Sequence, residues 1–496
     1  MKRFPKTAFA GLFASLLLLL TTACSGNEKH NAHDSTSALI QQNTNIVAFG
    51  KASVMDILNK ADYKHIPKLN VILGAQLQTW KKGFQIDAPV YFAAEAPFEA
   101  DGTPAAIYFL MDVTNKDSLL SVISEMGYAL EKSGEMSWFQ ENDVTFGVKD
   151  QLFILLSKKA PYDGKAIIEK AFNDAGGDLS EGKTSEILDM PGDIVTGLSI
   201  ERLYGTANTS LNKLPQAKQD ELKGLVADGF IANTVAFENG KAVVSIKNMF
   251  SEELKDRLFF QDNNGEALVN KLGNGKPWMG IAANIDMQKF EKFVTDFAPD
   301  ANRKITEQLP DEAGFMLMAL GGNAYSSIFS GQMGMVATGN PKTDLGLIFE
   351  FNAFLGLGKK GDSIKQMITE NLAGAPMQGD AYVMDNTAIA ARKDGIYIFS
   401  ASGAKTGGKL EFPSYAKGFG EKTFSMFIAF EQMDMKSLEL DEEMKVLEIM
   451  KYFTATADRD GATITLAAKD SSKNILKSVG DYYVGIMQDK IDQIVF

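Results

Sequence analysis

Residues 231–246 read IANTVAFENGKAVVSI and carry the clearest structural signal in the chain. Apolar and polar residues alternate on both sides of Asn239-Gly240, which is the pattern of two half-buried strands. Asn and Gly both tolerate the positive φ angles of a tight two-residue turn. The stretch therefore predicts a β-hairpin, and a hairpin joins two strands in antiparallel pairing.

Further hairpins are predicted along the rest of the chain. They are Asp143–Leu156 with a turn near Lys149-Asp150, Thr387–Phe399 with a turn at Asp394-Gly395, and Phe453–Leu466 with a turn at Asp460-Gly461.

Strand-helix segments and hairpins recur in the same order in two halves of the chain. The strand and amphipathic helix of Asn45–Leu58 match those of Trp278–Phe290, and Asp117 matches Asp362. The other matching pairs are Ala105–Met126 with Leu345–Asn371, Asp143–Leu156 with Thr387–Phe399, Asp193–Glu201 with Thr423–Glu431, and Ile231–Ile246 with Phe453–Leu466.

We therefore predict an internally duplicated α+β protein, with half one at 45–265 and half two at 275–496. Four strand-helix-hairpin units would form antiparallel sheets, with the helices packed on one face.

The N-terminus has the features of an export signal. A basic start is followed by the apolar stretch Ala8–Leu20 and by Thr21-Thr22-Ala23-Cys24, which contains the only cysteine of the 496 residues. This pattern predicts a signal peptide over 1–23 and lipid attachment at Cys24. The alternative is an ordinary signal peptide with an incidental cysteine. Lipid attachment implies anchoring in the outer membrane, on either its periplasmic or its cell-surface face.

Residues 24–44 are mostly polar and show no period, so we expect a disordered tether. The tether contains His30 and His33 and leaves His65 as the only histidine of the folded part. Without a folded cysteine there is no thiol nucleophile, and one histidine cannot build a multi-histidine metal site. A Ser-His-acid triad would depend on His65. The sequence thus predicts no enzyme, no metal and no cofactor.

The net charge of the chain argues against one further class of partner, nucleic acids. The formal net charge is −13, and loss of Lys2, Arg3 and Lys6 with the signal makes it −16. An acidic chain lacks the basic footprint that nucleic acid requires, so we expect none as a partner. We also expect the lipid to be what holds the chain at the membrane. A literal GxGxxG motif spans 356–361, but hairpins surround it, and we expect a strand-to-helix loop there and no phosphate site.

The segment Ala313–Asn340 is unusual because its 28 residues include no charge and several methionines. Methionine adapts to irregular apolar shapes and is common at binding surfaces. We therefore name Tyr325, Phe329, Met333 and Met335 as candidate ligand-binding residues. In this interpretation the loop Gly321–Gly334 is an exposed apolar surface. The alternative is that the segment consists of buried sheet strands joined by a Gly/Ser loop.

One run of residues resembles a known family. Gly83-Phe84-Gln85-Ile86-Asp87-Ala88-Pro89-Val90-Tyr91-Phe92 is similar to a signature of Bacteroidetes lipoproteins of roughly 500 residues. That family is catalogued as a domain of unknown function. The likeness covers most of the chain and includes the lipid-anchored start, the strand-helix opening Ile46–Leu58 and the Asp143–Leu156 hairpin. It brings no catalytic residues.

The sequence as a whole predicts a cell-envelope lipoprotein that acts as a non-catalytic binding or structural module. One alternative is an envelope hydrolase that uses two carboxylates. Another is a carrier that holds an apolar ligand between its two halves.

Overall fold

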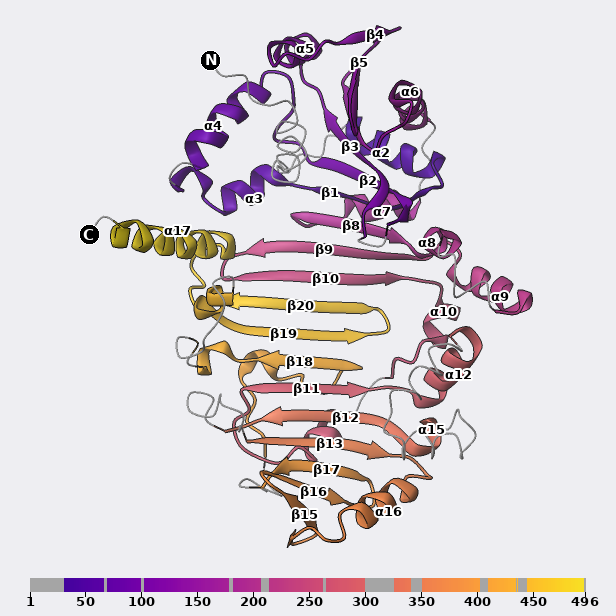
Figure 1. Cartoon of the computed structure of the whole chain (residues 1–496), viewed down its shortest axis with the longest axis vertical. Coiled ribbons are helices and arrows are strands. Elements are labelled where there is room, and N and C mark those ends of the chain that lie inside the picture. The colour runs from indigo at the N-terminus through magenta and orange to yellow at the C-terminus, as the bar shows by residue number, and fades with distance from the viewer. Residues whose placement is uncertain are drawn as a thin grey trace. The chain divides into compact units, whose positions relative to one another are not determined.

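The structure is a computed structural model of the chain, and it separates into two compact units. It describes residues 31–66, 69–99, 102–177, 182–206, 214–261, 265–298, 325–339, 350–401, 409–433, 435 and 444–494. Unit 1 comprises 1–207, 227–249 and 471–496, and unit 2 comprises 208–226 and 250–470. Both units combine helices with antiparallel strands, so the predicted α+β class is confirmed (Figure 1). The predicted signal peptide and Cys24 lie outside the described residues.

The strands of unit 1 pair in the order β10-β9-β8-β1-β2-β3-β7-β6-β5-β4, and every pair is antiparallel. The strands are β1 (Ile46–Ala52), β2 (Val90–Phe98), β3 (Pro104–Asp112), β4 (Glu131–Ser133), β5 (Met136–Glu141), β6 (Val144–Lys149), β7 (Leu152–Ser157), β8 (Ile194–Ser199), β9 (Phe230–Glu238) and β10 (Lys241–Met249). The helices are α2 (Asn31–Gln42), α3 (Val54–Lys60), η1 (Tyr63–His65), α4 (Leu69–Trp80), α5 (Lys116–Glu125), α6 (Gly164–Ala175), α7 (Lys183–Asp189), α8 (Ile200–Thr206) and α17 (Ile475–Ile494).

Helices cover both faces of this sheet, so the prediction of helices on one face is wrong. Strand β7 reads LFILLS, and its consecutive residues Ile154 and Leu155 are both buried. Ile154 packs in a cluster with α2, α6 and α7, whereas Leu155 packs in a second cluster with α5. Because successive side chains of a strand point to opposite faces, an unbroken apolar run requires cover on both sides.

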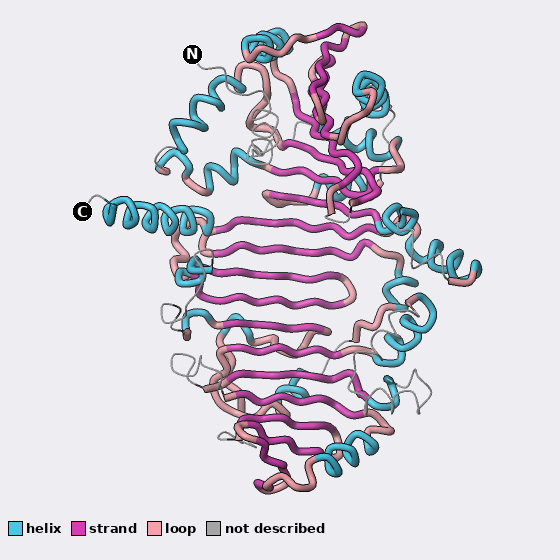
Figure 2. Tube along the Cα trace, viewed as in Figure 1, coloured by secondary structure: helices cyan, strands magenta, loops and turns pink. Residues whose placement is uncertain are grey.

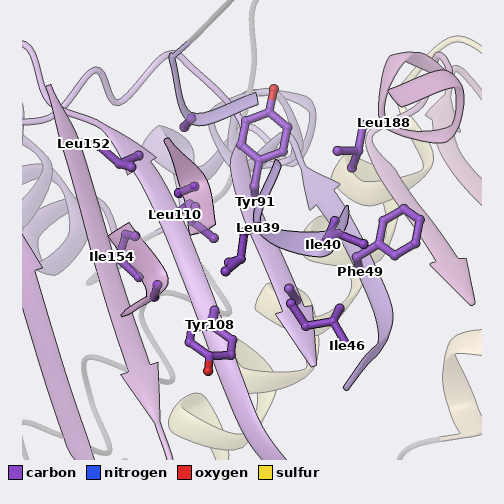
Figure 3. Close-up of a cluster of buried hydrophobic side chains, with 14 of the residues drawn as sticks. Leu39, Ile40, Ile46, Phe49, Tyr91, Tyr108, Leu110, Leu152, Ile154 and Leu188 are labelled. Atoms are coloured by element: carbon purple, nitrogen blue, oxygen red, sulfur yellow. The ribbon is translucent and has the colours of Figure 1, made fainter. Parts of the chain in front are cut away.

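The expected tether over 24–44 is also wrong for Asn31–Gln42, which form helix α2. Leu39 and Ile40 are fully buried among sheet residues of unit 1 (Figure 3). The amide of Ala32 donates to Asp112 Oδ1 at 2.8 Å, and Arg202 Nη1 donates to the carbonyls of Ile40 and Ile46, each at 2.8 Å. An acid at the N-terminus and a cation at the C-terminus both suit the helix dipole. Distant side chains therefore fix both ends of α2, and those partners are invisible in the local composition.

Unit 2 has its own antiparallel order, β20-β19-β18-β11-β12-β13-β17-β16-β15-β14 (Figure 2). The strands are β11 (Met279–Asn284), β12 (Phe329–Ala337), β13 (Phe351–Leu357), β14 (Met377–Gln378), β15 (Ala381–Met384), β16 (Thr387–Ala391), β17 (Gly395–Ser400), β18 (Phe424–Ile428), β19 (Met450–Asp458) and β20 (Gly461–Ala468). The helices are α9 (Gln216–Val226), α10 (Glu252–Arg257), α11 (Gly265–Val269), α12 (Met287–Phe297), α15 (Tyr325–Ile328), α16 (Asp362–Asn371), η3 (Ser414–Ala416), η4 (Phe430–Gln432) and η5 (Met444–Ile449).

The two strand orders correspond one to one, because β1 to β10 take the same places as β11 to β20. The correspondence extends to single bonds. Ser53 N, which follows β1, donates to the carbonyl of Asp193 at 2.7 Å. Asn284 N, at the end of β11, donates to the carbonyl of Thr423 at 2.7 Å. Asp193 and Thr423 each precede the strand that pairs there, so they occupy matching positions.

Two predicted turns lie elsewhere than expected. Asp458 pairs with Gly461, so the turn of the last hairpin is Arg459-Asp460, and Asp460 N donates to Asp458 Oδ1 at 3.0 Å. Gly395 opens β17, where a Cβ would lie 2.3 Å from the Phe354 ring. At Gly395, the absence of a side chain allows close packing against Phe354. The Arg459-Asp460 turn is instead stabilised by a side chain-to-backbone hydrogen bond of the Asx type.

The segment Ala313–Asn340 is described over 325–339. The loop expected over Gly321–Gly334 is described from residue 325, and residues 325–334 form α15 and the start of β12, so the loop prediction is wrong for them. The strand predicted from Leu345 is found as β13, which begins at Phe351.

Candidate functional site

One face of the unit 2 sheet is apolar and incompletely covered, and we call it the open face. Residues directly opposite each other in antiparallel strands lie on the same face, so the registers define its members. Three successive rows cross the six strands β20, β19, β18, β11, β12 and β13, which gives three times six, or 18, residues. The rows are Leu466, Phe453, Ile428, Met279, Ala337 and Phe351; Ile464, Ala455, Met426, Ile281, Met335 and Ala353; and Ala462, Ala457, Phe424, Ala283, Met333 and Leu355.

Most of these side chains remain in contact with solvent. Ile281 and Met333 are each 37% exposed, and Ala337 is the buried member of the set. The other members are half-buried. An isolated exposed hydrophobic residue is normal on a protein, whereas a contiguous exposed apolar patch marks a site of interaction.

The opposite face of the central strands is covered by buried apolar side chains. Ala282, Val336 and Phe427 pack there against Leu268 and Phe419 in a buried cluster. Both faces of β18, β11, β12 and β13 are therefore apolar, although the described residues cover one of them only in part. On antiparallel sheets the exposed face is ordinarily polar.

The alternation of the outer two strands also turns their apolar side toward the open face. Phe453 and Ala455 of β19 lie on it, whereas Thr454 and Thr456 lie on the other side. A strand of this pattern normally directs its apolar side into a core.

Helices border one end of the open face. Helix α15 packs on α12 and on β12, and Figure 1 draws both helices at the same end of β11 and β12. Phe290 and Phe329 belong to the cluster there, together with the open-face residue Leu355. The open face is thus limited on this side by an apolar wall.

Two of the four candidate ligand residues lie on the open face, namely Met333 and Met335. The other two lie in the wall. Tyr325 is buried, with its ring 5.9 Å from that of Phe290, and Phe329 is half-buried in the same cluster. The sequence analysis overlooked Ile281, Met426 and Phe453, which complete the surface. Their strands read as ordinary core strands, and the missing cover is a tertiary property that no local pattern contains.

Ion pairs mark the end of the face at the β19–β20 turn. Lys422 Nζ lies 2.5 Å from Asp458 Oδ2, and Arg459 pairs with Glu252. Burial is the largest influence on Asp458 and raises its pKa, but the hydrogen bonds from Lys422 and from the amides of Asp460 and Gly461, together with the Lys422 charge, bring the pKa below its ordinary value. The hydrogen bond with Asp460 raises the pKa of Lys255. The charged groups at this end of the face are therefore paired with one another.

The catalytic candidates are occupied in structural contacts. His65 is 80% exposed and bonds to Asp62. In the loop of the GxGxxG motif, the amides of Gly358 and Lys360 donate to the carbonyls of Ile328 and Ser327 at 2.7 and 2.8 Å. A phosphate would have to compete for these donors.

The buried carboxylates of unit 1 are engaged as well. Glu95 accepts from Tyr108 at 2.9 Å and from Asn43 at 2.6 Å. Asp193 lies 2.5 Å from Lys60 Nζ and accepts from Phe237 N at 2.6 Å. Each carboxylate therefore joins separate elements of the fold.

The chain matches no protein-family model and no curated protein sequence. Two solved structures of TP0453 align to it. Crystal form I aligns with 7% identity and a TM-score of 0.26, over 45% of this chain and 83% of that one. Crystal form III aligns with 10% identity and a TM-score of 0.21, over 73% and 91%. In the described part of the chain, no helix is both long and apolar enough to span a bilayer, and no group of three or more His, Cys, Asp or Glu is arranged to hold a metal.

Proposed function

We propose that this chain is a lipid-anchored binding protein of the outer membrane, without catalytic activity, and that it captures an apolar partner on the open face of unit 2. The observation that carries the proposal is the set of 18 contiguous apolar side chains, 17 of which are at least partly exposed. A surface of this kind lowers stability and solubility in isolation, so its presence favours a partner.

Anchoring through Cys24 is the second part of the proposal. It is supported by the basic start, the apolar stretch and the single cysteine that follows small residues. Replacing Cys24 with Ala should abolish metabolic labelling by a fatty-acid probe, because the chain has no other thiol. Labelling that persists in this variant would contradict the anchor.

The third part is an internal duplication with four strand-helix-hairpin units. The one-to-one strand order supports it, as do the matching bonds of Asp193 and Thr423. A crystal structure with a different strand order in either unit would contradict it.

Crosslinking in intact cells tests the capture. The double variant Ile281→Gln/Met333→Gln should lose crosslinked partners that the unchanged protein retains. Met126→Gln is the matched control, because Met126 is also 37% exposed and lies at the end of α5 in unit 1. Equal capture by the double variant and by the control would reject the open face as the binding site. Protease accessibility on the same cells would report which side of the membrane carries the protein.

A further inference from the structure

We propose that the open face of unit 2 binds the hydrocarbon chains of a lipid, taken up as a single molecule. This inference rests on the proposed binding function and names the ligand class of that same site.

The chemistry of the side chains favours hydrocarbon. None of the 18 residues carries a side-chain nitrogen or oxygen. Specific protein interfaces carry about one hydrogen bond per 100–200 Å², together with Tyr, Trp and Arg at their energetic centres. The open face offers no such group to a protein partner. A ligand without hydrogen-bond donors or acceptors leaves no polar group unpaired when it binds there.

The size of the face points in the same direction. Six strands at about 4.8 Å spacing, and three rows about 6.8 Å apart, cover roughly 29 by 20 Å, or about 600 Å². A stable protein interface needs about 800 Å² from each partner. The face is therefore small for a second copy of this chain, and it is long enough across the strands for extended alkyl chains.

The border and the side-chain types suit a flexible guest. The row of Phe424, Ala283, Met333 and Leu355 runs beside the wall formed by Phe290 and Phe329. A chain lying in this row would contact the sheet below it and aromatic rings beside it. Four of the 18 residues are methionines, whose side chains adapt to irregular apolar shapes.

The matching face of unit 1 is also apolar in its outer rows, Ile231, Leu198, Ala48 and Ala94 on one side and Val235, Ile194, Ala52 and Val90 on the other, but its central row differs. There the central row runs through Asn233, Thr196, Gly50 and Phe92. Asn233 Nδ2 donates to Thr196 Oγ1 at 3.1 Å, and a Cβ at Gly50 would lie 2.6 Å from the Phe92 ring. A polar pair and the Phe92 ring over Gly50 thus interrupt the central row of unit 1, where unit 2 has Ile281, Met426 and Ala455. The uninterrupted apolar face is that of unit 2, and we therefore place the ligand there.

A bilayer surface is a poorer match than a single lipid molecule. A bilayer presents its polar headgroups to a flat protein face, and these 18 side chains offer headgroups nothing to bind. The alkyl chain of a single molecule can instead lie directly on them.

The test uses the mature chain with Cys24→Ser and the fluorescent fatty acid cis-parinaric acid below its aggregation concentration. We expect saturable binding at one site and displacement by palmitic acid. Across saturated acids of increasing length, each methylene should tighten binding up to about fourfold, which corresponds to ~0.8 kcal/mol. Ile281→Gln/Met333→Gln should weaken binding at least tenfold, while Met126→Gln should leave it unchanged.

Thermal melting of each variant separates binding from folding, and the double variant should melt within a few degrees of the parent because both sites are solvent-exposed. Should its fold fail, Ala353→Phe, which fills the face with an apolar ring, replaces it and should weaken binding by a similar factor.

The proposal is wrong if binding is not saturable, or if the face variants bind the fatty acid with the affinity of the parent protein. It is also wrong if the protein binds neutral phosphatidylcholine vesicles and not the monomeric acid. A fourth contrary result is a dimer of the parent protein that the double variant no longer forms. If cells still lose their crosslinked partner with the double variant while the fatty acid does not bind, the proposed binding function stands and the lipid inference falls.

Discussion

In unit 1 the side chains of Thr196 and Asn233 bond to each other on the central strands, whereas unit 2 places Met426 and Ala455 at the matching positions. The strand order around these positions is the same in both units. Backbone pairing, set by hairpins and crossovers, is thus compatible with either a polar or an apolar central row on the matching face. The difference indicates that the sheet is a common scaffold and that the central row of one face distinguishes the two units.

The covered faces differ in how they are sealed. Unit 1 uses α2, whose ends are bonded by Asp112 and Arg202. Unit 2 uses Leu268 of α11 and Leu272, which follows that helix, together with the segment around Phe419. Each unit therefore has a complete core of its own, and the cover of unit 1 includes residues close to the chain's N-terminus.

The largest effect is expected when α2, which covers one face of the unit 1 sheet, is removed. Deletion of residues 31–42 exposes the pocket that holds Leu39 and Ile40, and we expect a loss of about 5 kcal/mol or more, since each such truncation costs about 2–5 kcal/mol. Hydrogen exchange should become fast at β2, β3 and β7, and the amides of β11 and β12 should keep their protection. Deletion of 25–30 is the control and should leave all of these amides protected. Unchanged protection after the longer deletion would show that α2 is dispensable.

The second comparison concerns the matching positions Asp193 and Thr423. Asp193→Ala leaves Lys60 and the amide of Phe237 without their partner, and Lys60 is 35% exposed, so its charge returns to water. We expect a cost of about 2–3 kcal/mol, less than for a fully buried pair. Thr423→Val removes a single 3.1 Å bond to the carbonyl of Gln261 and should cost about 1 kcal/mol. Denaturant titrations measure both variants, and equal losses would mean that the buried acid contributes nothing specific to unit 1.

The sequence reveals the strands and their succession because hairpin turns and alternation are local signals. It predicts that β8 corresponds to β18 and that the β9–β10 hairpin corresponds to the β19–β20 hairpin, and the predicted bounds of these strands are correct within a few residues. It misses α2, because burial of Ser35, Thr36 and Ser37 depends on neighbours distant in the sequence. It also misses the extent of the open face. Met333 was found through an unusual composition, whereas Ile281 and Phe424 lie in strands whose residues are typical of a core.

A third experiment converts one unit toward the other. Met426→Thr/Ala455→Asn copies the polar pair of unit 1 onto unit 2. Both positions are half-buried, and the new side chains can bond to each other, so stability should change by less than about 1 kcal/mol. Fatty-acid binding should fall about tenfold, because the middle row of the face becomes polar. Binding that survives with parent affinity would separate the binding site from these two strands.

The smallest expected difference lies in two matching turns. Gly379-Asp380 joins β14 to β15, and Gly134-Glu135 joins β4 to β5; both glycines have positive φ, +63° and +60°. In the unit 2 turn, Asp380 accepts two hydrogen bonds from Arg392, at 2.8 and 3.2 Å.

The hydrogen bond from Arg392 lowers the pKa of Asp380 below its ordinary value of 3.8, while partial burial acts in the opposite direction. A carboxyl whose folded-state pKa is lowered stabilises the fold above its unfolded pKa and loses that contribution as the pH falls through the folded value. Asp380 is 62% exposed, so solvent screens the pair and the contribution should be about 0.5 kcal/mol or less. Carboxyl NMR titration should give a value below 3.8 for Asp380, and Asp380→Asn should remove a small part of the destabilisation that sets in below about pH 4. Arg392→Gln should return the Asp380 titration toward its ordinary value. If the titration of Asp380 is the same with and without Arg392, the ion pair has no energetic role, and the two turns differ in sequence alone.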